Sequence, residues 1–161
     1  MGSCSNPTRC IQFGGSTPSG AHNVIDFVTI QTLGNAQDFG DLITANNGGP
    51  QLACSSSTRG LFGGGRNAPS NNQTNTIEFV TISSTGNATD FGDLITARRF
   101  GSTCSSLIRG IFAGGTTTPG GNVNVVEYVN IASTGDAANF GDLPSAMFSM
   151  AGMSSGHGGL G

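Results

Sequence analysis

Residues 109–143 read RGIFAGGTTTPGGNVNVVEYVNIASTGDAANFGDL, and this stretch decides the fold. The same unit occurs twice earlier, over 9–42 and 59–94. The arginines that open the copies are spaced by 50 and 50 residues, at Arg9, Arg59 and Arg109. The phenylalanines that close them are spaced by 52 and 49 residues, at Phe39, Phe91 and Phe140. A period near 50 is typical of a repeat architecture.

The composition narrows the fold class. Only 9% of the 161 residues are charged, none is lysine, and 27 are glycine. The chain is therefore too poor in charge for a disordered polyelectrolyte and too poor in helix formers for a helical bundle. Apolar residues show no helical period of about 3.6 residues. We expect an all-β protein.

Charge and hydropathy exclude several partners. The net charge is -3, and six basic residues cannot form the basic stripe that nucleic-acid binding needs. There is no apolar run of about 18 residues and no charged leader followed by an apolar segment. We expect no nucleic-acid partner, no membrane span and no signal peptide.

Each unit is predicted to form four short strands. In the second copy they lie around 53–56, at 59–63, at 77–82 and at 89–94. The third of these is the most β-prone, because it is rich in β-branched and aromatic residues. The glycine pair 64–65 after the second strand allows a turn with positive φ.

Three cysteines share one repeat position, five residues before the arginine: Cys4, Cys54 and Cys104. Cys10 stands where the other two copies have glycine. The distance between the Cα atoms of equivalent residues in neighbouring repeats generally exceeds about 7 Å, which is the limit for a disulfide. We expect free thiols that fill a tight apolar layer. His22 and His157 occupy unrelated repeat positions and no Cys-x-x-Cys pair occurs, so we expect no metal site.

These features resemble the blades of kelch-type β-propellers, which have four strands per repeat of about 50 residues. Each copy has the double glycine after its second strand, at 14–15, 64–65 and 114–115. Glu78-Phe79-Val80 is similar to the kelch third strand, and Arg98 after Leu-x-x-Ala also has a kelch counterpart. The chain departs from the family in having no tryptophan, since phenylalanine takes its place. The near-identity of the copies resembles repeats of structural proteins of marine tailed phages.

The resemblance implies a β-propeller with blades at about 3–45, 50–97 and 101–146 and an extra terminal strand over 147–161. Three blades cannot close a ring, because known propellers typically have four to eight. We expect self-association, most simply a homodimer that forms a six-bladed ring. The N-terminal and C-terminal copies of the first strand would compete for one position in the ring. A trimer, or a fragment of a larger protein, therefore remains an alternative.

The recurrence of arginine at the same position of each copy, at 9, 59 and 109, favours a structural role. An acid recurs near the end of each copy, at Asp41, Asp93 and Asp142. A repeated ion pair or an arginine bound to a carbonyl group explains this match. The alternative is that these arginines line a pocket mouth and bind an anion.

Binding is expected in the loops between the second and third strands. The loops 16–23, 66–76 and 116–124 differ in sequence and length and are rich in Asn, Thr, Gly and Pro. Variable loops on a constant scaffold are where binding usually occurs. The predicted ligand-binding residues are His22, Arg66, Asn71, Asn72, Asn122 and Asn124.

No catalytic motif recurs, so we predict neither enzymatic activity nor a cofactor. The run Ser154-Ser155-Gly156-His157 repeats a strand and is not a nucleophile elbow. A propeller-borne copper oxidase would need Tyr, His and Cys ligands, and the chain has one tyrosine and two histidines. Two functions remain: a structural or adhesive module of a virion that binds a protein or a glycan, and a cytoplasmic kelch-type protein-interaction domain.

Overall fold

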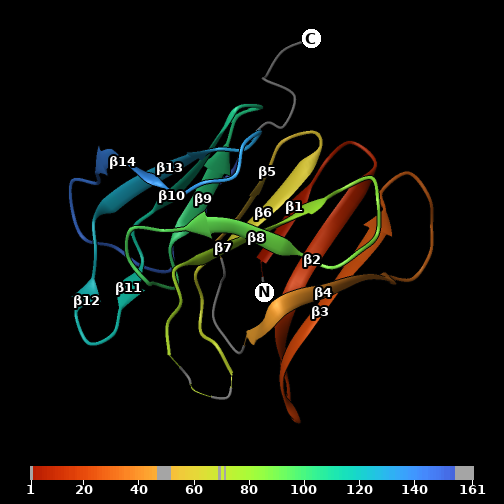
Figure 1. Ribbon diagram of the computed structural model, residues 1–161, viewed down its shortest axis with the longest axis horizontal. Coiled ribbons are helices and arrows are strands. Elements are labelled where there is room, and N and C mark those ends of the chain that lie inside the picture. Colours follow the sequence, from red (N-terminus) through yellow and green to blue (C-terminus); the bar gives the residue numbers. More distant parts are fainter. Residues whose placement is uncertain (1, 47–51, 69, 71, 155–161) are drawn as a thin grey trace.

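The computed structural model describes residues 2–46, 52–68, 70 and 72–154. These residues form three four-stranded antiparallel sheets and one two-stranded sheet, with no helix among them (Figure 1). No described element is a helix of the length and apolar character needed to cross a membrane. The all-β prediction is confirmed.

Each large sheet is built from four strands in chain order, and the small sheet is inserted between the second and third strands of the third one. The first sheet consists of β1 (Gly2–Ser5), β2 (Arg9–Thr17), β3 (Gly20–Thr29) and β4 (Gln37–Asn46). The second consists of β5 (Leu52–Ser55), β6 (Arg59–Gly63), β7 (Thr76–Thr81) and β8 (Thr89–Asp93). The third consists of β9 (Ser102–Ser105), β10 (Arg109–Ala113), β13 (Val125–Asn130) and β14 (Ala138–Asp142). The small sheet pairs β11 (Thr116–Thr117) with β12 (Gly121–Asn122).

The strand predictions for the second copy agree with the structure to within one or two residues. The prediction of a strand at 59–63 matches β6, and the prediction at 77–82 matches β7. Residues 147–154 contain no strand, and 155–161 lie outside the described residues.

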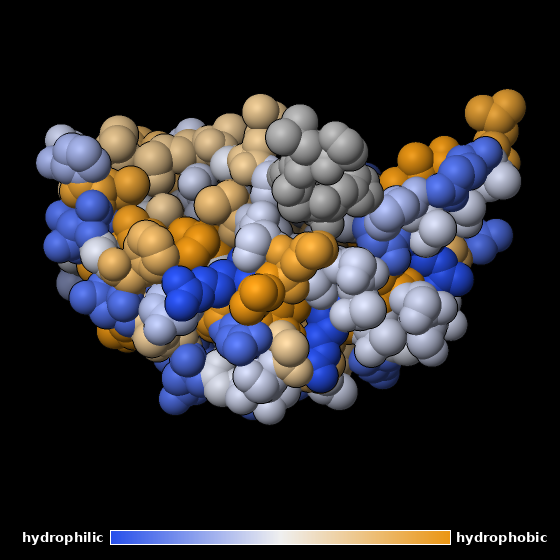
Figure 2. Space-filling model, turned by 90° about the horizontal axis from the view of Figure 1, so that it is seen from above, coloured by the Kyte–Doolittle hydropathy of each residue, from blue (hydrophilic) through white to orange (hydrophobic). Residues whose placement is uncertain are grey.

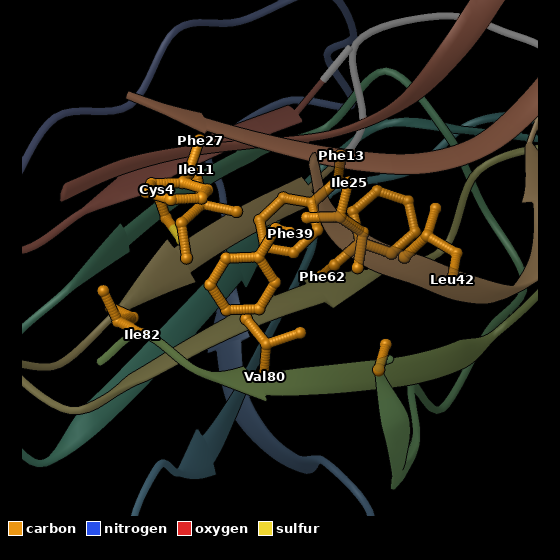
Figure 3. Close-up of a cluster of buried hydrophobic side chains, with 11 residues drawn as sticks. Cys4, Ile11, Phe13, Ile25, Phe27, Phe39, Leu42, Phe62, Val80 and Ile82 are labelled. Carbon is orange, nitrogen blue, oxygen red and sulfur yellow. The ribbon is translucent and has the colours of Figure 1, made fainter. Parts of the chain in front are cut away.

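The three large sheets lie side by side in chain order (Figure 1). Their first strands are neighbours, since β1 contacts β5 and β5 contacts β9. A hydrophobic core fills the space between each pair of adjacent sheets. Figure 3 shows the first core, where Phe13 of β2 stacks on Phe62 of β6 with ring centroids 5.5 Å apart.

The two cores use the same repeat positions. The first and third sheets each contribute apolar residues to one core, and the second sheet contributes a different set to each of the two cores. The second sheet places Phe91 in the second core and Phe62 in the first. Both side chains are 2% exposed. A sheet with one neighbour on each side therefore has both of its faces buried.

A loop of each following sheet is hydrogen-bonded to the last strand of the sheet before it. The Gly86 and Ala88 amides donate to the Phe39 and Asp41 carbonyls at 2.7 and 2.8 Å. At the next junction, the Gly135 and Ala137 amides donate to the Phe91 and Asp93 carbonyls at the same distances. We call this arrangement the loop junction.

A glycine in the last strand makes room for this loop. Gly92 has φ +142°, and a Cβ atom there would lie 2.5 Å from the Gly135 carbonyl oxygen. Both the backbone conformation and the close approach require glycine. The strand pair also shifts register here, between Ile77 and Glu78, which marks a β-bulge.

The repeat arginines bind carbonyl groups of the following sheet. Arg9 Nη1 donates to the Ile82 carbonyl at 2.9 Å, and Arg59 Nη1 donates to the Ile131 carbonyl at 3.0 Å. The Arg59 guanidinium also lies 4.8 Å above the Phe79 ring. The carbonyl-binding interpretation is confirmed for Arg9 and Arg59. Within the described residues, neither forms an ion pair with an aspartate.

Two buried glutamates at the same repeat position form hydrogen bonds across the two junctions. Glu78 Oε2 accepts a hydrogen bond from the Ile43 amide, and Glu127 Oε2 accepts one from the Ile95 amide, each at 2.9 Å. Burial raises the pKa of Glu78, the Ile43 amide opposes this shift, and Asp90 adds to it. Glu127 instead has a cation partner, since its Oε1 lies 3.1 Å from Nη1 of the fully buried Arg98.

Phe91→Ala should lower the free energy of unfolding by about 3–5 kcal/mol, because it removes a buried ring from the second core. The matched control is Ile95→Ala, which shortens a side chain that is 56% exposed. The control should change the free energy by about 0.5 kcal/mol or less. Urea unfolding followed by circular dichroism measures both, and equal losses would contradict the assignment of the core.

Replacing the two glutamates by glutamine should have opposite results. Glu127→Gln leaves the Arg98 charge buried without its anion and should cost about 3–5 kcal/mol at neutral pH. Glu78→Gln keeps an acceptor for the Ile43 amide and removes a buried charge. This variant should be as stable as the wild type at pH 7, or more stable.

The pH dependence of the free energy of unfolding tests whether the Glu78 carboxylate destabilises the protein. Because folding raises the pKa of Glu78, this group lowers stability as pH rises above the unfolded value of about 4.3. The stability of Glu78→Gln relative to wild type should therefore grow between pH 4 and pH 7. Urea unfolding over this range measures it, and a difference that shrinks with rising pH would contradict the assignment.

Candidate functional site

The loops expected to bind lie along one edge of the molecule, which we call the loop edge. In Figure 1 the β2–β3 hairpin tip and the described part of the β6–β7 connection lie at the bottom, and the β11–β12 hairpin lies at the lower left. Each begins after the double glycine of its copy. In the second copy, Gly64 has φ +65° and Gly65 has φ +105°, which turns the chain away from the sheet.

A buried asparagine joins the first loop to the second. Asn46 pairs with His22 in the first sheet and forms an isolated bridge with Asn67 of the next loop. Its side-chain oxygen accepts a hydrogen bond from the Arg66 amide at 3.0 Å, and its Nδ2 donates to the Gly64 carbonyl at 3.2 Å. Asn46 is 2% exposed, so it fixes these loops from beneath.

A glutamine joins the second loop to the third. Gln73 Nε2 donates to the Thr116 carbonyl at 3.0 Å, and Gln73 Oε1 accepts from the Thr118 amide at 2.7 Å. Gln73 also pairs with Arg66 within its own loop, and Thr116 pairs with Asn122 in the β11–β12 hairpin. Hydrogen bonds thus connect the loops of all three copies.

Two arginines carry the positive charge of the loop edge. Arg99 bridges to Thr116, and burial together with the nearby Arg66 charge lowers the pKa of Arg99. Both Nε atoms are buried without a hydrogen-bond partner among the described residues. The Arg99 guanidinium lies 4.6 Å above the Phe100 ring. Two neighbouring cations without a carboxylate partner among the described residues favour an anionic ligand.

A hollow of about 220 Å³ opens between the first two sheets beside these loops. Its polar lining comes mainly from amide and hydroxyl side chains: Thr44, Asn46, Asn67, Thr74 and Thr76. The carboxyl groups of Glu78 and Asp90 also line it. Such groups supply both donors and acceptors for a polar ligand.

The structure brings most of the predicted binding residues to this edge. His22 Nε2 is hydrogen-bonded to Thr17 Oγ1 at 2.9 Å within the first hairpin. Arg66 lies in the second loop, and Asn72 and Asn122 are exposed. Asn71 lies outside the described residues.

Asn124 has a different role. Its carbonyl accepts from the Leu143 amide at 2.7 Å, and its Nδ2 lies 3.4 Å from the Leu143 carbonyl. Asn75 makes the same two contacts with Leu94 in the second sheet. We assign Asn124 to holding the last strand, and we leave it out of the proposed binding surface.

Sequence reasoning did not single out Asn46, Gln73 or Arg99, although Gln73 lies within the predicted loop 66–76. A signal existed for Asn46, which stands where the other copies have Arg98 and Met147. No repeat signal marks Gln73 or Arg99. Their roles follow from the close approach of the second and third loops.

The cysteines are free thiols, and two of them fill the apolar layer as predicted. Cys4 and Cys54 are buried, and burial raises the pKa of Cys54 to about 12. Burial also raises the pKa of Cys4 well above the ordinary thiol value. These two thiols are poor nucleophiles at neutral pH.

No family model and no curated protein matches the chain. Among solved structures, 128 chains match. One of them, titled "Structure of YjhT", superposes with a TM-score of 0.70 at 10% sequence identity. The alignment covers 89% of this chain and 52% of that chain, so the chain spans about half the length of the structure it matches. A likeness at this identity shows the fold alone, an all-β array of four-stranded antiparallel sheets.

Proposed function

We propose that the chain is a non-enzymatic structural or adhesive module whose sheets are kelch-like propeller blades and whose loop edge binds a ligand. The observation that carries this proposal is the continuous chain of hydrogen bonds from His22 through Asn46 and Gln73 to Thr116. Loops held in this way form one surface instead of three independent connections. Preorganised loops on a rigid scaffold are suited to binding, because little conformational entropy is lost.

The ligand class we propose is an acidic glycan, such as one that carries a uronic or sialic acid. Arg66 and Arg99 supply charge for a carboxylate, and charge-assisted hydrogen bonds are roughly twice as strong as neutral ones. Asn72 and Asn122 are exposed beside them and offer both donors and acceptors for sugar hydroxyl groups. The adjacent polar hollow would accommodate part of a sugar.

The setting we propose is the virion of a tailed phage. The near-identical, lysine-free and glycine-rich copies resemble repeats of structural proteins in such particles. A surface position there would give the loop edge access to glycans of a host cell. The scaffold would remain constant while the loops differ between copies, as the ranges 16–23, 66–76 and 116–124 do.

Binding of the labelled chain to a glycan array that contains sialylated, uronic-acid and neutral glycans tests this function. Acidic glycans should be bound preferentially, and Arg66→Ala or Arg99→Ala should weaken binding of the best one about tenfold or more. The control Thr85→Ala changes an exposed residue in the β7–β8 connection, and it should bind like the wild type.

Circular dichroism must show unchanged melting for the arginine variants, because otherwise lost binding would only report lost folding. Binding of neutral glycans alone, or full binding by both arginine variants, would overturn the assignment of the loop edge. The melting temperature and the array signal therefore separate a binding role from a structural one.

A further inference from the structure

The two outer faces of the array expose apolar side chains whose counterparts are buried at the internal junctions. In the third sheet, Phe140 is 56% exposed, whereas the phenylalanines at the same position in the other sheets are 2% exposed. In the first sheet, Ile30 is 53% exposed, whereas its counterparts Ile82 and Ile131 are at most 1% exposed. The β3–β4 connection lies at the right edge of Figure 1, and hydrophobic atoms reach the surface at that end in Figure 2.

The outer faces also retain the polar groups of a loop junction. Residues 34–36 are the first-sheet counterparts of 86–88, whose amides bind the carbonyls of the preceding sheet. Residues 140–142 are the counterparts of the acceptor segment 39–41. Within the described residues, neither outer segment forms such a bond to another sheet. One face therefore offers the donors and the other offers the acceptors.

Arg109 and Gly141 are likewise prepared for a following sheet. The Arg109 guanidinium lies 4.7 Å above the Tyr128 ring, as Arg59 lies above Phe79, and Arg59 uses this pose to bind the next sheet. A Cβ atom at Gly141 would meet no described atom within 4 Å. The space that the Gly135 loop fills at Gly92 is open here.

The cysteines distinguish the two outer faces from the internal junctions. A Cβ atom built on Gly60 would lie 2.6 Å from Cys4 Sγ, and one on Gly110 would lie 2.7 Å from Cys54 Sγ. Such distances are too short for a non-bonded contact. In a disulfide, however, each sulfur lies about 3 Å from the Cβ of the other cysteine, since an S–S bond of about 2.05 Å joins them. Cys10 is the residue at this position in the first sheet, and Cys104 is the third-sheet counterpart of Cys54.

We propose that the outer face of the third sheet binds the outer face of the first sheet in a second copy of the chain, and that Cys104 of one copy forms a disulfide with Cys10 of the other. Loop 34–36 then binds the 140–142 segment, and Arg109 binds the Ile30 carbonyl of the partner copy. Cys10, which replaces the glycine of the other two copies, thus lies where the opposing face supplies the thiol of Cys104. The occupant is a second copy because its two faces are complementary halves of a junction that the chain already forms twice.

The bond forms by oxidation of the two thiols. Glutathione disulfide accepts two electrons and two protons from the thiol pair and leaves as two molecules of glutathione, while one S–S bond forms between the copies. Cys10 and Cys104 are partly exposed in the single chain, unlike Cys4 and Cys54, so the oxidant can reach them. A hollow of about 70 Å³ lies beside Cys10 on this face.

The C-terminal segment occupies the position that β1 of the partner copy takes in the proposed junction. Ser154 Oγ lies 3.3 Å from Ser105 Oγ, so this segment follows β9 where the first strand of another sheet would lie. Cys4 contacts Gly60 of β6, which is a second strand. The equivalent contact of Cys104 is therefore with β2 of the partner copy, and β1 of that copy, which pairs with β2 at Cys10, replaces the C-terminal segment beside β9.

The test uses the full chain at micromolar concentration, oxidised with glutathione disulfide and compared with a sample in dithiothreitol. We expect a dimer on a non-reducing gel and a peptide that joins Cys10 to Cys104 in mass spectrometry. Cys10→Ser and Cys104→Ser should each abolish the crosslink, whereas Cys54→Ala should retain it. A crosslink between two copies of Cys10 or two copies of Cys104 would overturn the head-to-tail arrangement, as would the absence of any crosslink.

Light scattering in dithiothreitol tests the non-covalent junction separately. Cys10→Gly, which restores the residue found at 60 and 110, should remain a dimer. Ala36→Arg places a long side chain at an exposed position that the junction would bury, and it should give a monomer with unchanged melting. The matched control Ala132→Arg, at a position exposed in all three sheets, should remain a dimer. A monomeric wild type would overturn the junction and would leave glycan binding by the loop edge unaffected.

Discussion

Each sheet in this chain depends on the loop junction, in which two amides of one sheet bind two carbonyls in the last strand of the sheet before it. A single antiparallel sheet of this size has two faces and cannot bury both by itself. The junction fixes the distance and register between sheets so that Phe39 and Phe91 are both covered. Glycines at 40 and 92 allow the backbones to approach closely enough for these bonds. Stability then accrues between neighbouring sheets, as in other repeat proteins.

The junctions also determine where polar residues are tolerated in the interior. Glu78 and Glu127 bind the same backbone position of the preceding sheet, yet only Glu127 is opposite an arginine. Asn46 stands in place of that arginine at the first junction and directs its amide group to the second loop instead. One repeat position thus supports an ion pair at one junction and organises the loop edge at the other.

Much of this architecture could be predicted from the sequence because the repeat reports each element three times. The second strand at 59–63, the glycine turn at 64–65 and the carbonyl-binding role of Arg59 follow from patterns that are local or periodic. The loop edge was predictable only as a region, since Gln73 and Arg99 lack counterparts in the other copies. Asn124 was placed among the binding residues because it lies in the variable loop 116–124. Its bond to Leu143 depends on strand register, which the sequence does not display.

Hydrogen exchange of individual amides, followed by NMR in dilute solution, tests the loop junction most directly. The account predicts that Gly86, Ala88, Gly135 and Ala137 exchange as slowly as amides within the strands, because each is bonded across a junction. The amide of Gly34, the counterpart of Gly86, should exchange rapidly in the monomeric Ala36→Arg variant, where no second copy covers it. Exchange at Gly86 and Ala88 as rapid as at Gly34 in that variant would contradict the central place given to this junction.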